Sequence, residues 1–183
     1  MNTKSRKLHL TIKNIFKKHG LSYNHAKICA DALIHAELVD APSHGLSRLK
    51  MYCDRIKKKL INPQPKIKIK KISKSITHID ANNSIGFVVA DIGIKKAISN
   101  AKKTGIGLVA IKNSGHYGLS GYYAEQAVKK NLIAMCFTNA PPAIAPHGAK
   151  KSLFGTNPIC FGTPIASKVP FILDTSVSVI NRG

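Results

Sequence analysis

Apolar side chains recur every three or four positions through the N-terminal part of the chain, which is the period of helices that bury one face. The pattern predicts a helix over residues 4–19 that ends at Gly20. A second helix is capped by Ser22 and continues to about Asp40, where a proline follows and interrupts it. The chain therefore begins with a helical part.

Beyond residue 66 shorter apolar or alternating segments are separated by turn residues, as is typical of strands. Strands are predicted over 66–73, 75–80, 106–111, 132–138, 159–163 and 170–173, and helices over 88–103 and 119–130. Because the segment 106–111 is apolar throughout, we interpret it as a buried strand. The predicted elements indicate a protein that mixes helices with sheet.

The composition is that of an ordinary globular protein, because a hydrophobic fraction of 44% can bury a sizeable core. The sequence contains no apolar run of membrane-spanning length and no signal-peptide core, so a cytoplasmic protein is expected. The four cysteines show no C-x-x-C or zinc spacing, and we interpret them as reduced thiols. No metal site is expected.

The net charge of +21 suggests an acidic partner such as nucleic acid. The basic residues are nearly all lysine, however, and a surface that grips phosphate usually recruits arginine. A nucleic-acid-binding protein therefore stays an alternative and is not the main hypothesis.

The first candidate site is the loop Asn113-Ser114-Gly115-His116-Tyr117-Gly118, between the strand 106–111 and the helix 119–130. Glycines there let a ligand approach the backbone, and loops on a rigid scaffold often carry chemistry. The spacing matches neither a dinucleotide fingerprint nor a phosphate-binding loop. The alternative is a turn in which backbone groups satisfy the imidazole of His116.

The second candidate site is the start of a third helix, which is predicted to begin at Ser43 or His44. Arg48 follows His44 by four residues, so both side chains are expected on one side of that helix. Arginine can hold a carboxylate with its planar fork, and histidine can exchange a proton. The alternative is a helix cap beside a surface arginine.

Several motifs in order resemble one family, the malate/L-lactate dehydrogenase-type oxidoreductases, which use NAD(P) and are not Rossmann proteins. The motifs are Ser43-His44-Gly45-x-x-Arg48, Asn113-Ser114-x-His116-Tyr117-Gly118, Thr138-Asn139-x-Pro141-Pro142-x-x-Ala145-Pro146, Phe154-Gly155-Thr156-Asn157-Pro158, and Asp174-x-Ser176 with Arg182-Gly183. The resemblance implies an α+β fold with N-terminal helices and a largely antiparallel sheet domain. It divides the chain into a helical part with a connecting strand, 1–75, and an incomplete cofactor-binding part, 76–183.

The resemblance also implies a reaction. NAD(P)H transfers hydride to a 2-oxo acid to give a 2-hydroxy acid, usually in a homodimer. His44 matches a proton donor in some members, His116 matches an acid/base in others, and Arg48 matches a position that binds the substrate carboxylate.

By the same resemblance the cofactor, NAD or NADP, is expected at Asp174, Thr175 and Ser176. Ala140 stands where the family usually has a serine that contacts the nucleotide. Family members are close to twice as long as this chain, which therefore resembles their N-terminal half. An inactive remnant of such an enzyme is the second alternative.

Overall fold

The computed structural model describes residues 3–167 and 169–178 and divides into two units, Met1–Leu119 and Ser120–Gly183. The expected division at 75/76 falls between two strands of the first unit, β1 (Lys68–Lys71) and β2 (Ile76–Ser84), which are hydrogen-bonded neighbours. The first unit therefore combines residues from both expected parts.

The first unit begins with the two predicted helices, α1 (Thr3–Lys18) and α2 (Tyr23–Leu38). Gly20 has a φ of 91°, a left-handed conformation that suits glycine at the end of a helix. The Ser22 hydroxyl accepts a hydrogen bond from the N–H of His25 at 3.2 Å. The predicted stop and cap are both confirmed.

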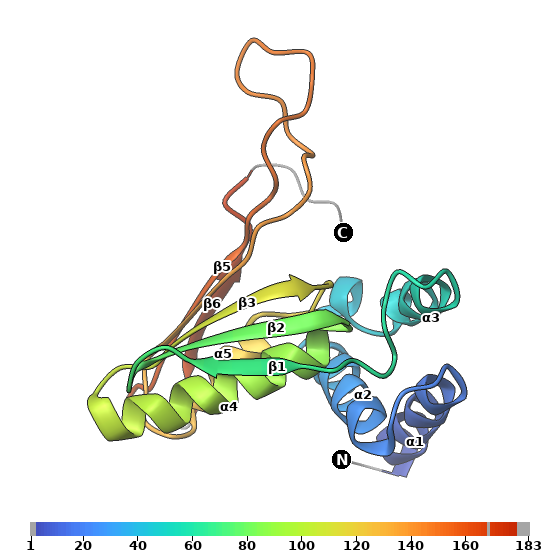
Figure 1. Cartoon of the computed structure of the whole chain (residues 1–183), viewed down its shortest axis with the longest axis horizontal. Helices are drawn as coiled ribbons and strands as arrows, with labels where there is room; N and C mark the ends of the chain where they lie inside the picture. Colours follow the sequence, from blue (N-terminus) through green and yellow to red (C-terminus); the bar gives the residue numbers. More distant parts are fainter. Residues whose placement is uncertain (1–2, 168, 179–183) are drawn as a thin grey trace. The chain divides into compact units, whose positions relative to one another are not determined.

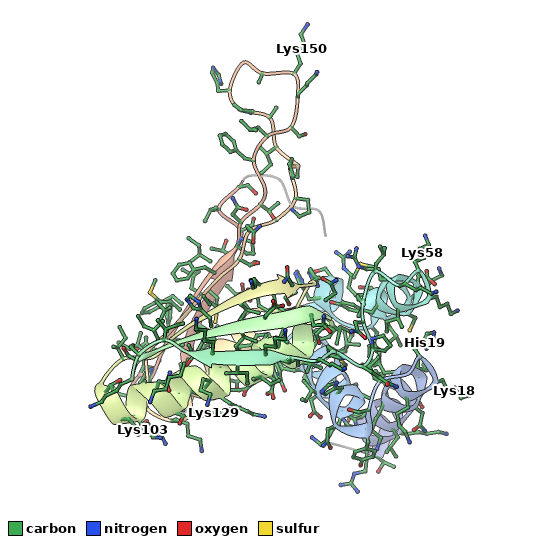
Figure 2. All side chains as sticks on the ribbon, viewed as in Figure 1. Lys18, His19, Lys58, Lys103, Lys129 and Lys150 are labelled. Atoms are coloured by element: carbon green, nitrogen blue, oxygen red, sulfur yellow. The ribbon has the colours of Figure 1, made fainter. Side chains whose placement is uncertain are left out.

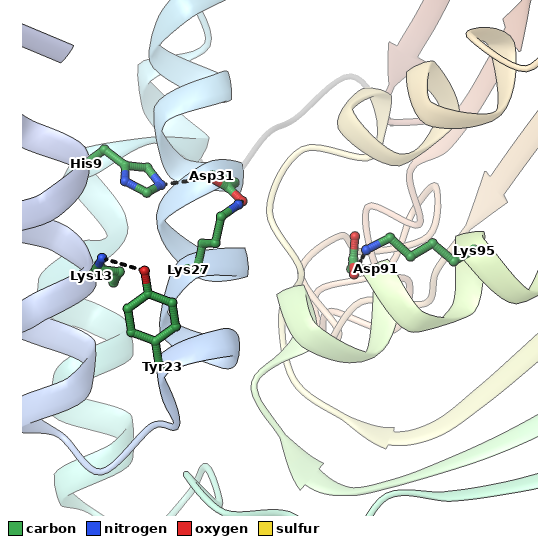
Figure 3. Close-up of polar contacts among 7 residues, drawn as sticks. All are labelled: His9, Lys13, Tyr23, Lys27, Asp31, Asp91 and Lys95. Carbon is green, nitrogen blue, oxygen red and sulfur yellow. Dashed lines mark hydrogen bonds and ion pairs between the residues drawn. The ribbon is translucent and has the colours of Figure 1, made fainter. Parts of the chain in front are cut away.

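Helices α1 and α2 pack together through apolar side chains. Figure 3 shows polar contacts between the same helices. Phe16 and Leu33 are fully buried. At the edge of this contact the Nε2 atom of His9 lies 2.7 Å from Oδ1 of Asp31, and the Lys27 ammonium donates to the other oxygen of the same carboxylate. The loop that follows α2 packs against this helix.

The predicted third helix is wrong at its start. Two short 3₁₀ turns, η1 (Pro42–His44) and η2 (Leu46–Arg48), precede the helix α3, which spans Leu49–Lys57. The backbone of Gly45, with φ −94° and ψ −135°, is not helical and separates the two turns. His44 and Arg48 therefore lie in successive turns and do not share one face of an α-helix.

A mixed sheet completes the first unit, with strand order β1-β2-β3 (Figure 1). Strand β3 (Leu108–Ser114) runs parallel to β2, and the helix α4 (Gly86–Thr104) makes the connection between them. Helix α4 ends at Gly105, whose left-handed φ of 82° suits glycine at the end of a helix. The parallel register pairs Ser84 with Ser114, so both strands end at the same edge of the sheet.

The segment 106–111 was predicted to be a buried strand, and the prediction of burial is wrong. Residues of β3 are half-buried or exposed in this unit, because β3 is an edge strand and α4 covers one face of it. Val109 and Ile111 point toward α4, where an added Cβ at Gly93 would contact their side chains. The apolar run reflects a strand with one covered face.

In its described residues, the second unit consists of an antiparallel sheet and one helix. Its elements are α5 (Gly121–Val128), β4 (Ala134–Phe137), β5 (Ile159–Thr163) and β6 (Phe171–Thr175). Helix α5 packs on the sheet at Gly162, where a Cβ would lie 3.1 Å from Val128 and 3.2 Å from Ala124. Three of the four strand pairings among the described residues are antiparallel, which confirms the expected α+β fold with a largely antiparallel sheet.

The positive charge is spread over many elements of both units. Figure 2 labels Lys18 on α1, Lys103 on α4, Lys129 directly after α5, and Lys150 in the loop between β4 and β5. Within the described ranges, every helix is too short or too polar to cross a membrane.

Candidate active site

The structure brings the two histidines of interest together in the first unit. The ring centroids of His44 and His116 lie 5.9 Å apart, and the ring planes are inclined by 23°. The residues come from the η1 turn and from the loop after β3, which are far apart in the sequence. Both predicted histidines therefore contribute to one site.

The loop that carries His44 is held by a carboxylate of α2. The Oε1 atom of Glu37 accepts a hydrogen bond from the N–H of Leu46 at 2.6 Å, at the start of η2. A Cβ added at Gly45 would overlap the same carboxylate. Glycine at this position therefore lets Glu37 come close enough to fix the backbone next to His44.

Arg48 is directed back over the same loop. Its Nε atom donates to the carbonyl oxygen of Ser43 at 2.6 Å, and the Ser47 hydroxyl donates to the carbonyl of Pro42 at 2.6 Å. The bond to Ser43 uses only Nε, so the two Nη groups of the guanidinium are not consumed by it. Nη groups are the part of arginine that completes a bidentate pair with a carboxylate.

His116 is held by hydrogen bonds to one ring nitrogen. The Tyr52 hydroxyl lies 2.6 Å from Nδ1, and the N–H of Gly118 donates to the same nitrogen at 3.2 Å. The Tyr52 side chain is fully buried and its ring centroid lies 4.8 Å from that of Phe87. The hydroxyl that faces His116 is therefore part of a rigid core.

The backbone of the His116 loop packs tightly against the first turn of α4. A Cβ added at Gly86 would overlap the carbonyl oxygens of Gly115 and His116. The N–H of Gly115 also donates to the carbonyl of Ser84 at 3.3 Å, which continues the strand pairing into the loop. Helix and strand together determine where the His116 ring lies.

The surroundings of His116 favour its neutral form. Burial, as the largest cause, and the positive charges of His44, Arg48 and Arg55 together lower the pKa of His116 to about 4. The neutral ring is therefore the dominant form near neutral pH.

This lowered pKa predicts a pH effect on stability. Between pH 6.5, the ordinary histidine value, and about pH 4 the unfolded chain binds a proton at His116 that the folded chain does not bind. The contribution of His116 to the free energy of unfolding should therefore decrease as the pH falls through this window. Urea unfolding of the wild type and of His116→Gln at several pH values measures it. We expect the wild type to lose more stability on acidification than the variant, and parallel losses in the two proteins would contradict the prediction.

The positions expected to bind the cofactor lie in the second unit. Asp174 is near the end of β6, and its Oδ2 atom accepts a hydrogen bond from the N–H of Gly121, the first residue of α5, at 2.7 Å. The Thr175 hydroxyl donates to the carbonyl of Ser176 at 3.1 Å, and the Ser176 hydroxyl donates to the carbonyl of Ser178 at 3.2 Å. The structure therefore places a carboxylate and two hydroxyls in consecutive positions.

Ala140 lies in a loop of the same unit. Its N–H donates to Oδ1 of Asn157 at 2.9 Å, and a Cβ at Gly155 would overlap its carbonyl oxygen. Carboxylate and hydroxyl groups suit the hydroxyls of a ribose, so the chemistry at 174–176 fits a nucleotide. Arg182 and Gly183, which belong to the motif that led to this expectation, lie outside the described residues.

Possible metal ligands are scattered over the described part of the chain. No group of three or more His, Cys, Asp or Glu side chains there is arranged to hold a metal ion. His9 and Asp31 form a pair on α1 and α2.

Two residues that position the site, Tyr52 and Glu37, carry no sequence signal that identifies this role. Tyr52 has the spacing of a packing residue on the apolar face of α3, but it also follows Arg48 by one helical turn and so can lie on the same side. No local sequence pattern indicates the role of Glu37, because it lies nine residues before Leu46, whose N–H it binds.

Comparisons with known proteins agree in one family. A profile described as malate/L-lactate dehydrogenase matches residues 3–183. A malate dehydrogenase of Pyrococcus abyssi is 42% identical over 172 residues, which are 94% of this chain and 47% of the relative. The solved structure of malate dehydrogenase from Pyrococcus horikoshii OT3 has a TM-score of 0.91 at 40% identity and covers 96% of this chain and 50% of that chain.

The names of two further relatives include a cofactor. A (2R)-3-sulfolactate dehydrogenase (NADP(+)) of Chromohalobacter salexigens is 37% identical and covers 86% of this chain and 47% of the relative. A ureidoglycolate dehydrogenase (NAD(+)) of Escherichia coli O157:H7 is 32% identical and covers 86% and 45%. The chain thus spans about half the length of the curated relatives that it matches.

Proposed function

Because the chain belongs to the malate/L-lactate dehydrogenase family, we propose that it is an NAD(P)-dependent oxidoreductase that interconverts a 2-oxo acid and a 2-hydroxy acid. The observation that supports this function is the stacked pair His44 and His116, with Arg48 close enough to lower the pKa of His116. Two imidazoles and one guanidinium are the groups that such a substrate needs for its oxygen and its carboxylate.

In this proposal Arg48 binds the carboxylate of the substrate. Its side chain is held at Nε by the carbonyl of Ser43, so the direction of its Nη groups is set before the substrate arrives. A guanidinium fixed in this way orients the neighbouring carbonyl, because the carboxylate and the carbonyl of a 2-oxo acid are adjacent and nearly rigid.

The imidazoles serve the substrate oxygen. When bound, a nicotinamide cofactor would supply the hydride, that is, a proton with two electrons, that the carbonyl carbon accepts. The C=O double bond becomes a C–O single bond, and the oxygen takes one proton from the protein to give the hydroxyl. Histidine is suited to this transfer because its ordinary pKa lies near the working pH.

For the cofactor we propose contacts at Asp174, Thr175, Ser176 and the backbone of Ala140. The carboxylate and hydroxyls at 174–176 can bond to ribose hydroxyls, and Ala140 contributes no hydroxyl of its own. The relatives include both an NAD(+) and an NADP(+) enzyme, so the proposal covers either cofactor. We also propose a cytoplasmic homodimer, as the family resemblance implies, which sedimentation can test.

The test of the function has two steps. First, the protein is titrated with NADH and with NADPH, and binding is followed by the fluorescence of the cofactor. Second, oxidation of malate, sulfolactate and ureidoglycolate is followed by the absorbance of the reduced cofactor. We expect saturable binding of at least one cofactor and turnover of at least one acid. Absence of binding up to millimolar cofactor would favour the alternative of an inactive remnant.

A further inference from the structure

The hydrogen bonds to His116 determine which of its nitrogens carries the proton. A backbone N–H can only donate, so Nδ1, which accepts from Gly118 at 3.2 Å, must present its lone pair. The Tyr52 hydroxyl lies 2.6 Å from the same nitrogen and must donate as well, because Nδ1 has no hydrogen to offer. In the neutral ring the hydrogen is then on Nε2.

Both donors are built into the fold. Tyr52 has no exposed surface and its ring packs against Phe87. Gly118 has a φ of 80°, and a Cβ there would lie 2.5 Å from Cε1 of Phe87, so glycine is required for this backbone path. Neither donor can turn away without disturbing the core of the first unit.

The surroundings of His44 are different. Its Nδ1 atom lies 3.0 Å from the hydroxyl of Ser43, and a hydroxyl can either donate or accept. This contact is therefore compatible with a protonated and with an unprotonated Nδ1. The ring of His44 can gain and lose a proton while it keeps its partner, which the ring of His116 cannot do at Nδ1.

We propose that Tyr52 and Gly118 are positioning residues that hold His116 as its Nε2–H tautomer, so that His116 donates a hydrogen bond to the substrate oxygen while His44 exchanges the proton. This inference rests on the proposed function and assigns separate roles to the two histidines.

The division of roles balances the reaction. In the reduction His44 begins as the imidazolium, gives one proton to the oxygen as hydride reaches the carbon, and ends neutral. In the oxidation it takes that proton back. The Nε2–H of His116 stays bound throughout and polarises the C–O bond, as neutral donors do in sites that stabilise a developing oxyanion. The same Nδ1 contacts that set the tautomer also oppose formation of a His116 cation.

The tautomer can be tested without turnover. Nitrogen NMR of the chain labelled with ¹⁵N-histidine distinguishes protonated from unprotonated ring nitrogens, and His116→Gln identifies the signals of His116. We expect a protonated Nε2 and an unprotonated Nδ1 for His116 near neutral pH. Tyr52→Phe keeps the ring packing but removes the hydroxyl, so it should shift the Nδ1 signal and raise the pKa of His116.

The matched control is Tyr23→Phe, which removes a hydroxyl that is bound to Lys13 at 3.3 Å, and it should leave the His116 signals unchanged. A predominant Nδ1–H tautomer in the wild type would overturn the inference. Identical His116 signals in the wild type and in Tyr52→Phe would overturn it too.

Kinetics test the assignment of roles. Glutamine retains an N–H donor, so His116→Gln should stay within about tenfold of the wild-type kcat, whereas His116→Ala should lose about 10²–10³-fold, the usual effect of removing one such donor. The kcat of His44→Gln should be about 10²–10⁴-fold below that of the wild type, because glutamine cannot exchange a proton with the substrate. The inference is wrong if His116→Gln is as slow as His116→Ala while His44→Gln retains activity. If the wild type turns over no acid, the proposed function fails, and the NMR result still decides the tautomer.

Discussion

Replacing Arg48 by lysine is expected to lower kcat/KM for a 2-oxo acid by about 10²–10³-fold, or roughly 3–4 kcal/mol of transition-state stabilisation. Lysine keeps the positive charge, but it has neither the planar fork nor an Nε atom that can bond to the carbonyl of Ser43. The carboxylate of the substrate would then be bound by a mobile point charge, and the adjacent carbonyl group would no longer be held in one orientation.

The measurement is steady-state kinetics on the acid that the wild type turns over. Arg55→Lys is the matched control, since Arg55 is an exposed arginine on α3 that also lowers the pKa of His116. We expect this control to stay within a few fold of the wild type. Near-wild-type kinetics in both variants would show that positive charge alone is sufficient, and an equal loss in both would show that the effect is not specific to position 48. Either result would remove Arg48 from the role of bidentate carboxylate ligand.

Replacing Gly86 by alanine is expected to destabilise the folded chain by about 3 kcal/mol, at the upper end of the usual effect of overpacking. The new methyl group would overlap the carbonyl oxygens of Gly115 and His116, which belong to the backbone and cannot rotate away. Either α4 or the His116 loop must shift, so the variant should also lose the defined tautomer of His116.

Gly93→Ala provides a comparison on the same helix. Its methyl group would lie 2.8 Å from Cδ1 of Ile111, the end of a flexible side chain, and alanine favours a helix interior. Urea unfolding should therefore show a change within about 1 kcal/mol for Gly93→Ala. If both variants lost the same stability, close packing of the His116 loop on α4 would not be the cause.

Local signals in the sequence were sufficient for most of the fold. Gly20 and Gly105 end helices because the left-handed conformation is needed there, and Ser22 caps α2 with its own hydroxyl. The strand 159–163 was predicted with the bounds that the structure has. Each of these features depends on a few neighbouring residues, so one sequence contains enough information to find it.

The errors arose where distant residues decide the structure. A helix from His44 is consistent with the local pattern, but Glu37 reaches the N–H of Leu46 from another helix and holds the intervening glycine out of the helical conformation. The apolar run of β3 does not reveal that the strand lies at the edge of its sheet.

The candidate site was predictable in part. His44 and His116 were found from loop chemistry and from the family resemblance, and the structure brings their rings together. Tyr52 was not found, because a tyrosine on the apolar face of a helix is usually only a packing residue. Its hydroxyl meets an imidazole 64 residues further along the chain, and no local pattern contains that pairing.

The parallel pairing of β2 with β3 limits which insertions and deletions this part of the chain can tolerate. Ser84 and Ser114 are register partners, and Gly86 and His116 each follow two residues later. Deletion of a single codon within β3 would turn successive side chains to the opposite face of the sheet and carry the His116 ring away from Tyr52. Insertions are better tolerated in the exposed loop around Lys150, between β4 and β5, which lies outside the pairing of β2 with β3.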